Sequence, residues 1–418
     1  MVPRLLALLV LSFTLLDAAP ALKIPPAAQA GPNFNAGIAT RAYLATQTPQ
    51  QKARSDAYFE GGYWLLLWDF LYGAAVSILL LSTGWSARMR DLAERLSRRL
   101  ATWLYWVQYV VAVSLLSFPL LVYEGFLRER SYGLMNQTFG AWFIDQTKGL
   151  ALAVIFGGLL IMALFAVVRR LPRTWHLWAA GVVIAFQLLA FLVYPVFIAP
   201  LFNTYKPLED ARVRDRILRL ARQNGLETSV VWQVDASRQS NRVSANVSGM
   251  LGTERITLND NLLNRCSPEA IEAVMGHEIG HYVLNHVHKF LAWLIIGAVA
   301  FFTILRWGLD WSLRRWGTRW GIRGIGDPAV LPLAILILSI LFFVSTPALN
   351  TLIRVQEYEA DLYGLNTARQ PDGEAEVDLL LGEYRKLEPA PLEEFLLFDH
   401  PSGYTRILAA MRWKAENQ

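Results

Sequence analysis

The sequence predicts an all-α polytopic membrane protein that carries one small α+β domain. Of its 418 residues, 54% are hydrophobic and 17% are charged. Its mean hydropathy is +0.31, and these values differ strongly from those of a soluble domain. The third observation is a set of apolar segments of roughly 20 residues, the length that crosses the hydrocarbon core of a bilayer. We therefore expect several helices to hold the chain in a membrane.

Six apolar segments are long enough to span a bilayer. Four precede a charged region and two follow it, at residues 61–83, 102–125, 149–169, 175–199, 289–306 and 329–350. A shorter apolar run at residues 5–16 follows Arg4 and precedes DAAPA. This pattern is typical of a signal peptide or of a short signal anchor, so the protein has six or seven spans.

These segments divide the chain into six parts. We expect a signal peptide or anchor, a polar segment outside the membrane, four spans, a mixed α+β region, two further spans and a polar C-terminal part, at residues 1–21, 22–60, 61–199, 200–288, 289–350 and 351–418. With one cysteine, Cys266, the chain cannot form an internal disulfide or a cysteine-based metal site.

Basic residues are concentrated in three loops between spans. Because cytoplasmic loops carry an excess of Lys and Arg, these loops are expected to face the cytoplasm, and the net charge of +5 is no argument for nucleic-acid binding. Alternation of the spans then places residues 200–288 and 351–418 on the opposite face. That face is the periplasm if the chain lies in a bacterial inner membrane. The loop arginines are Arg88, Arg90, Arg95, Arg98, Arg99, Arg169, Arg170, Arg173, Arg306, Arg314, Arg315, Arg319 and Arg323.

The mixed region reads as a small folded domain. DARVRDRILRLARQNG has a helical period that ends at Gly225, and SVVWQVD, SANVSGM and ERITLND are typical of short strands. A further helix should begin after Ser267, because serine at the N-cap followed by Pro268 at the first helical position is a strong start signal.

That helix carries the motif HEIGH at residues 277–281. His277 and His281 are one turn apart and project from the same face, so both can bind one metal ion. Two imidazoles at this spacing, with a glutamate after the first, are typical of zinc hydrolases, in which Glu278 would be the general base for a zinc-activated water. His286 and His288 do not fit the ligand spacing. We expect them to lie at the membrane interface or behind a ligand.

A third ligand must come from another segment. RVQEYEADLYG, after the last span, offers three carboxylates on a predicted helix. Glu357 and Asp361 share a helix face, whereas Glu359 points away. One of the first two is expected to complete the metal site, and the other to accept the ring N–H of a ligating histidine.

HEIGH followed across two spans by EYEAD resembles the integral-membrane zinc metallopeptidases related to the type I CAAX prenyl endopeptidases, which are gluzincins with glutamate as third ligand. The likeness includes IAPLFN, RITLNDNLL, YGLMNQTFGAWFIDQTKG and DHPSGYTRI, and so covers most of the chain. It implies a metalloendopeptidase in which a barrel of helices surrounds a chamber. The implied site holds one Zn²⁺ per chain on His277, His281 and Glu357, with Glu278 as base, Asp361 behind a ligand, and His400 and Arg406 in contact with substrate and transition state.

The resemblance also implies that an extended protein or peptide substrate, membrane-associated or not, pairs with one strand of the domain. In this chain that strand begins at Ser244, Ala245, Asn246 and Val247, where relatives commonly have Asn-Ala-Tyr or Asn-Ala-Asn. Addition of a strand to a sheet edge uses main-chain groups, so we expect this pairing despite the changed side chains. Nothing in the sequence indicates prenylated substrates.

Two other functions fit part of the pattern. Asp69, Gln108 and Gln187 lie inside predicted spans, where polar groups are costly and usually face an interior, as in a transporter. A catalytically silent relative could act as a membrane chaperone or scaffold. The compact polar domain and the complete set of hydrolase residues favour the membrane-embedded peptidase over a transporter, and a silent relative would usually lack a ligand or the base. The expected partners are a protein or peptide substrate and the lipid bilayer.

Overall fold

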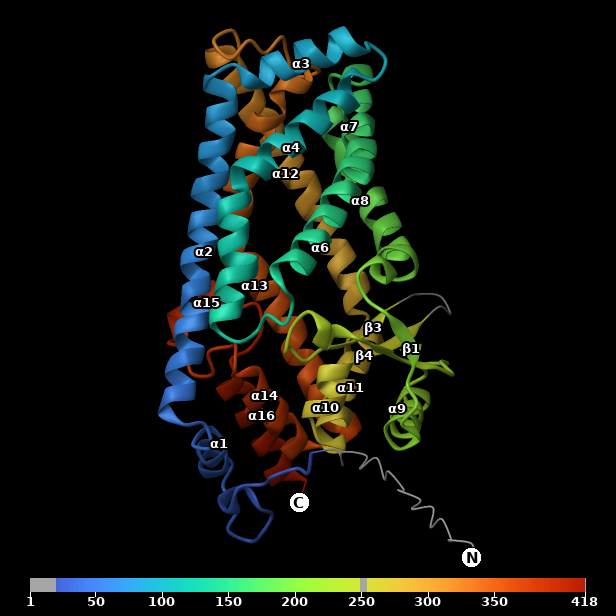
Figure 1. Ribbon diagram of the computed structural model, residues 1–418. Helices are drawn as coiled ribbons and strands as arrows, with labels where there is room; N and C mark the ends of the chain where they lie inside the picture. The colour runs from blue at the N-terminus through green and yellow to red at the C-terminus, as the bar shows by residue number, and fades with distance from the viewer. Residues whose placement is uncertain (1–19, 249–253, 418) are drawn as a thin grey trace, which may run out of the picture.

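The computed structural model describes residues 20–248 and 254–417. The predicted signal segment lies outside the described residues, apart from its last two positions. Figure 1 shows an elongated molecule: long helices fill one end, and a small sheet with shorter helices lies at the other. The fold therefore has the two parts that the sequence predicted.

Six helices of the described chain are long and apolar enough to cross a membrane. They extend beyond the predicted spans at one or both ends, and several contain π-helical or 3₁₀ turns. Including those turns, they run over Pro49–Ser82, Ala101–Ser131, Phe139–Arg170, Trp175–Leu201, His286–Trp316 and Pro328–Ala368. Their α-helical parts are α2 (Pro49–Ser82), α4 (Ala101–Val122), α5 (Glu129–Ser131), α6 (Phe139–Leu152), α7 (Gly158–Arg170), α8 (Trp175–Val193), α12 (His286–Trp316) and α13 (Leu331–Ala368).

One helix begins well before the apolar span that it contains. α2 starts at Pro49, within the segment expected outside the membrane, and the place of residues 49–60 relative to the membrane stays a prediction. Thr48 caps this helix, and Gln51 returns a hydrogen bond to the cap, which together form a capping box. The polar first turns therefore continue directly into the apolar span, because the start of a helix depends on its cap and not on hydrophobicity.

The spanning helices form a closed ring. In order around it, α2 contacts α4, α4 contacts α7, and α7 contacts α8; α8 contacts α12, α12 contacts α13, and α13 contacts α2 again. Only 6% of the most apolar stretch of the second, fourth and fifth spans is buried, whereas helices in a close-packed bundle bury the face toward their neighbours. The membrane part is therefore a helical barrel around a chamber.

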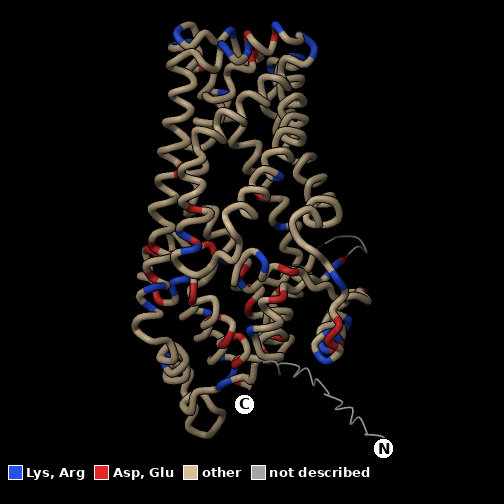
Figure 2. Tube along the Cα trace, viewed as in Figure 1, with Lys and Arg blue, Asp and Glu red and all other residues tan. Residues whose placement is uncertain are grey.

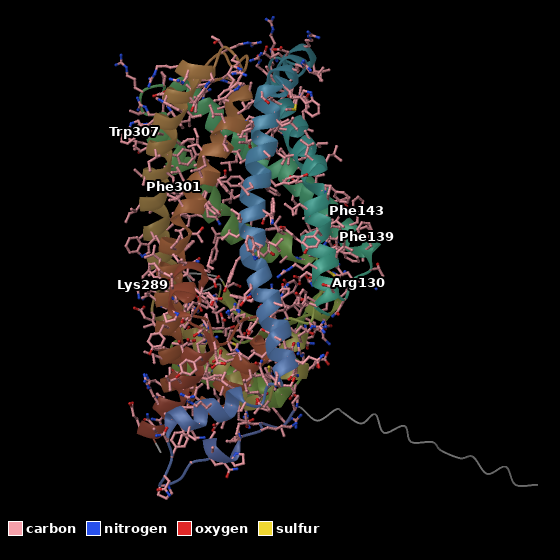
Figure 3. All side chains as sticks on the ribbon, turned by 90° about the vertical axis from the view of Figure 1, so that its left-hand side faces the viewer. Arg130, Phe139, Phe143, Lys289, Phe301 and Trp307 are labelled. Carbon is pink, nitrogen blue, oxygen red and sulfur yellow. The ribbon has the colours of Figure 1, made fainter. Side chains whose placement is uncertain are left out.

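An apolar band surrounds this barrel. Figure 3 shows Phe301 and Trp307 on one side and Phe139 and Phe143 on the other. Trp307 is 66% exposed, as expected for an aromatic side chain that faces lipid. Arg130 and Lys289 lie at one level on opposite sides of the barrel, toward the end that holds the sheet. We take this level as the membrane boundary on that side.

Basic residues gather at the far end of the barrel, around α3 (Trp85–Leu96), as Figure 2 shows. All three arginine-rich loops meet there, which agrees with the alternation of spans predicted from the sequence. Arg90 pairs with Asp327 at 2.5 Å, and both side chains are buried. Arg323 pairs with Glu94 at 2.7 Å on the surface of the same end. These contacts join the connection after the first span to the connection before the last.

The polar residues inside the spans have different surroundings. Gln108 donates a hydrogen bond to the carbonyl oxygen of Met89 at 3.0 Å, so it faces protein. Asp69 lies beside Glu124 of the following span. Gln187 is exposed, and its orientation toward an interior stays a prediction.

A four-stranded sheet lies beneath the barrel, in the order β1-β2-β4-β3. The three predicted strands are confirmed as β2, β3 and β4. β2 and β4 are parallel, and the other two pairs are antiparallel. The sequence did not indicate β1, because it has three residues and ends in a proline. The strands are β1 (Tyr205–Pro207), β2 (Val231–Val234), β3 (Ala245–Ser248) and β4 (Arg255–Asn259).

Helices before and after the strands cover one face of the sheet. Ile256 and Leu258 of β4 are fully buried, together with Ile217 from the helix before the strands and Ile271 from a helix after them. The helix predicted from DARVRDRILRLARQNG is confirmed. The covering helices are α9 (Ala211–Gln223), α10 (Asp260–Arg265) and α11 (Pro268–Val283).

The C-terminal helices pack against an N-terminal helix below the barrel (Figure 1). Tyr43, Ile407 and Met411 are buried in one cluster there, and the Tyr43 hydroxyl donates to Asp372 at 2.7 Å. The two ends of the described chain therefore support the same part of the molecule. These helices are α1 (Ala36–Leu44), α14 (Pro371–Leu381), α15 (Pro391–Leu397) and α16 (Gly403–Glu416).

The position of the arginine-rich end predicts the orientation of the protein. An alkaline phosphatase fused after Gln418 should be active in a bacterial host and a fluorescent protein at the same position silent, because the basic loops stay in the cytoplasm. The same reporters placed after Arg99 should give the reverse result. A fluorescent fusion after Gln418 with inactive phosphatase would show the opposite orientation.

Candidate metal centre

The helices that carry the predicted ligands touch backbone to backbone. A Cβ atom added to Gly276 of α11 would lie 3.0 Å from the carbonyl oxygen of Gly364 in α13. A Cβ on Gly280 would lie 3.1 Å from the Ala360 oxygen, and one on Gly364 would lie 2.8 Å from the His277 nitrogen. Small residues at these positions therefore allow α11 and α13 to approach closely.

The start of α11 is also fixed. The Ser267 side chain accepts a hydrogen bond from the Ala270 N–H at 3.1 Å, which confirms the predicted N-cap. The Ser267 hydroxyl in turn donates to Glu376 of α14 at 2.6 Å. The register of the HEIGH motif against its neighbours therefore depends on a cap that is itself held by a second helix.

Three donor groups converge where α11 faces α13. The Nε2 atoms of His277 and His281 are 3.0 Å apart, and the Glu357 carboxylate lies 3.3 Å from the first and 3.5 Å from the second. One ligand atom from each residue lies within 4.8 Å of the others, the only such group in the part of the chain that the structure describes. Two imidazole nitrogens and a carboxylate oxygen are the donor set of many catalytic zinc sites, so these residues fit the expected metal.

A buried ion-pair cluster lies behind His277. Its Nδ1 is 2.7 Å from the Asp361 carboxylate, and Arg406 donates to both oxygens of Asp361, at 2.9 and 2.6 Å. Arg406 also contacts Glu374 at 2.9 Å and Asp378 at 3.0 Å. Burial lowers the pKa of Arg406, but the charges of the three carboxylates outweigh it and hold that pKa well above its usual range. Asp361 therefore contacts the ring nitrogen of His277 that faces away from the other donor groups, the position that the resemblance implied for it.

The surroundings of Arg406 are those of a residue that supports its neighbours. It was expected to contact substrate and transition state, and this contact stays a prediction. Its side chain is 9% exposed, and each of its three nitrogens contacts a carboxylate. In the structure Arg406 holds Asp361, which in turn contacts His277. The sequence did not indicate the partners Glu374 and Asp378, since their spacing of four shows only a shared helix face.

His281 is supported by different residues. Its Nδ1 lies 2.8 Å from Nδ1 of His286, and Nε2 of His286 lies 3.1 Å from Glu359. Of the two predicted positions for His286, the structure therefore shows the one behind a ligand. His288 is exposed. Glu359 points away from the three donor groups, as its helical spacing predicted.

His400 reaches the same centre from the loop after α15. Its Nε2 lies 3.3 Å from the Glu357 carboxylate, and its Nδ1 lies 2.8 Å from Asp399. The hydrogen bond from His400 lowers the pKa of Asp399 below its ordinary value. Arg354, one turn before Glu357 on α13, donates to the carbonyl oxygen of Glu394 in α15 at 2.9 Å and to that of Phe398 at 2.5 Å, and so holds the start of the loop. Nothing in the sequence indicated this role of Arg354.

Glu278 lies between the two histidines in sequence and is partly buried. Burial raises the pKa of its carboxyl group, while His277 and His281 lower it. His400 acts in the same direction as the other histidines, and the negative charge of Glu357 opposes them. These four side chains are therefore close enough to Glu278 to affect the charge of its carboxyl group.

The predicted substrate strand lies at an edge of the sheet. Among the described strands, β3 pairs only with β4. Ala245 and Val247 pack against the core, whereas Ser244 and Asn246 are exposed. The carbonyl oxygen of Ser244 accepts from the Asn259 N–H at 3.0 Å, which fixes the start of the strand. The outer edge of β3 therefore has the main-chain groups that strand addition requires.

Comparison with known proteins supports this arrangement. Residues 41–204 match the model of the CAAX prenyl protease N-terminal family, described as five membrane helices, and residues 207–414 match peptidase family M48. The described chain has four membrane-length helices in the first interval, and the shorter α3 lies among them. Together the two matches account for nearly all of the described chain.

Individual relatives agree with the family matches. An uncharacterized metalloprotease of Bacillus subtilis, YhfN, is 30% identical over 296 residues, which are 70% of this chain and 69% of the relative. CAAX prenyl protease 1 of Saccharomyces cerevisiae is 27% identical over 320 residues, 71% of this chain and 69% of the yeast protein.

The fold has a close counterpart among solved structures. The crystal structure of S. mikatae Ste24p superposes with a TM-score of 0.74 at 22% identity, and the match covers 89% of this chain and 93% of that one. This similarity extends over the barrel and the domain beneath it. Since both parts of the chain also match their family models, and the Bacillus relative is similar over most of its length, this multi-pass membrane protein is a metalloprotease that belongs to peptidase family M48.

Proposed function

We propose that this metalloprotease is a zinc endopeptidase in which His277, His281 and Glu357 hold the ion. The observation that carries the proposal is the convergence of these three side chains within 4.8 Å, with Glu278 adjacent in the same helix. When bound, a zinc ion would lower the pKa of a water ligand toward ~7 and polarise the substrate carbonyl group. The remaining steps depend on residues of this chain.

Glu278 acts as general base and then as general acid. Its carboxylate takes a proton from the attacking water and delivers that proton to the leaving amine of the cleaved peptide bond. Burial, which raises its pKa, makes the carboxylate a better proton acceptor. The same group can serve in both steps because it lies beside the metal ligands and cannot move away with the product.

His400 stabilises the oxyanion that forms when the peptide carbonyl is attacked. Its Nδ1–H is directed at Asp399, so the imidazole can donate from Nε2 as well when it is protonated. That Nε2 lies beside Glu357, at the edge of the three donor groups. A donor at this position acts where charge develops during the reaction.

The substrate is an extended segment of a protein or peptide that pairs with the outer edge of β3. Main-chain pairing holds such a segment whatever its side chains are, so it suits an enzyme that cuts unfolded or flexible chains. The name of the yeast relative, CAAX prenyl protease 1, refers to prenylated substrates. For this chain we propose only the extended peptide, because main-chain pairing is the recognition that its residues support.

The ligand assignment predicts the metal content of variants. The purified protein should hold one zinc per chain, as measured by plasma mass spectrometry after gel filtration. His277→Ala and Glu357→Ala should each lose the zinc, since two remaining ligands bind it weakly. Glu278→Gln should keep it. Full zinc content in Glu357→Ala would contradict the assignment of the third ligand.

The base assignment predicts the activity of Glu278→Gln. Its cleavage of an unfolded protein should fall by about 10² to 10⁴-fold, because the amide cannot take the proton from water. A chelator should abolish wild-type cleavage, and added zinc should restore it. Proteomics of membranes that contain wild type or Glu278→Gln would identify substrates through new N-termini formed only by the wild type. Near-wild-type cleavage by Glu278→Gln would contradict the mechanism.

The oxyanion assignment predicts that His400→Ala lowers turnover by about 10² to 10³-fold. His400→Gln should lose less, because its amide can donate from nearly the same position. Both variants should retain zinc and an unchanged unfolding temperature. If turnover of His400→Ala equalled that of the wild type, His400 would have only a structural role in its loop.

A further inference from the structure

The chain changes direction between α11 and α12, and this turn brings His286 back toward the metal centre. α11 ends at Val283 and α12 begins at His286. Between them, Asn285 has a left-handed conformation with φ 57°, which asparagine tolerates better than most residues. On a continuous helix, His286 would be rotated by about 140° from His281. After the turn, the two rings lie 5.0 Å apart at an angle of 72°.

The contact between these rings determines which nitrogen carries each hydrogen. Nε2 of His281 faces His277 and Glu357, so it is the atom available to the metal, and the hydrogen of a neutral His281 is on Nδ1. The atom that faces Nδ1 of His281 is Nδ1 of His286, 2.8 Å away. A hydrogen bond between two ring nitrogens needs one donor and one acceptor, so Nδ1 of His286 accepts. Its own hydrogen is then on Nε2 and is donated to Glu359.

We propose that His286 is a positioning residue for the metal: it fixes the ring orientation and the tautomer of the ligand His281. The inference rests on the proposed zinc site and extends it to a residue that does not touch the ion. Metal-bound histidines commonly donate their other N–H to a carboxylate or carbonyl group, and loss of that acceptor weakens metal binding. Here the acceptor for His281 is the neutral imidazole of His286, and the acceptor for His277 is the carboxylate of Asp361.

The outer part of this chain of hydrogen bonds is exposed, and its inner part is not. The His286 side chain is 4% exposed, whereas Glu359 and Lys289 are 43% and 45% exposed. Lys289 lies 2.7 Å from the same Glu359 oxygen. Exposed ion pairs contribute little because water screens them. The contribution to the metal site therefore comes mainly from His286, which is shielded from water and in direct contact with the ligand.

A pair of variants with the same shape tests the acceptor role. His286→Leu and His286→Asn have side chains of nearly equal size, but only asparagine offers an oxygen near the position of the histidine Nδ1. We expect His286→Leu to raise the zinc dissociation constant of the full-length protein about 10- to 100-fold in competition with a chelator. His286→Asn should restore most of that affinity. His288→Ala, two residues along on an exposed site, should bind zinc as the wild type does.

The unfolding temperature of each metal-free variant shows whether a loss of affinity comes from the fold. It should be unchanged in His286→Leu, and His286→Ala is a second variant without an acceptor if leucine disturbs the packing. Equal zinc affinity in His286→Leu and wild type would overturn this inference and leave the proposed zinc site intact. So would an equal loss of affinity in the leucine and asparagine variants. A wild-type protein without zinc affinity would overturn both.

Discussion

The close approach of α11 and α13 is the constraint on which the site depends. A Cβ atom added at Gly276, Gly280 or Gly364 would lie 2.9, 3.1 or 2.8 Å from the nearest atom of the facing helix. The backbones therefore approach closely, and His277 reaches Glu357 across the contact. Close contacts of this kind are typical of membrane helices, where small residues replace hydrophobic burial as the source of packing. Here one partner is a helix of the polar domain and the other is the 38-residue α13. The contact thus fixes the metal centre to the barrel and not only to the sheet.

The two histidines that we propose as ligands are held by different kinds of residue. Behind His277 lies a buried cluster in which Arg406 compensates three carboxylates. Burial raises the pKa values of Glu374 and Asp378, and the positive charge of Arg406 opposes this. Behind His281 lies the imidazole of His286, which contacts the exposed pair of Glu359 and Lys289. The buried cluster of charged groups is therefore on the side of the core, and the imidazole is on the side where α12 begins.

Local patterns predicted the elements, and long-range contacts explain what they missed. Hydropathy identified the six spans, the alternation of apolar residues identified three strands, and Ser267 with Pro268 located the start of α11. No local pattern indicated that Arg406 lies behind Asp361, because its partners Glu374 and Asp378 are on another helix. For His286 the sequence left two positions open, because helical spacing directs it away from His281, and only the left-handed turn at Asn285 brings it back. The glycines of α11 and α13 can be seen in the sequence, but the sequence does not show which helix packs against each of them.

The membrane part contributes residues to the site as well as an anchor. α12 begins at His286, three residues before Lys289, which lies at the level that we take as the membrane boundary. α13 leaves the barrel and carries Glu357 and Asp361. These two helices are neighbours in the closed ring. A change in the distance between α12 and α13 would therefore move His286, which contacts His281, relative to Glu357. The proposed metal centre needs the barrel for its geometry, since α11 provides the two histidines but neither the proposed third ligand, Glu357, nor the residues behind the histidines.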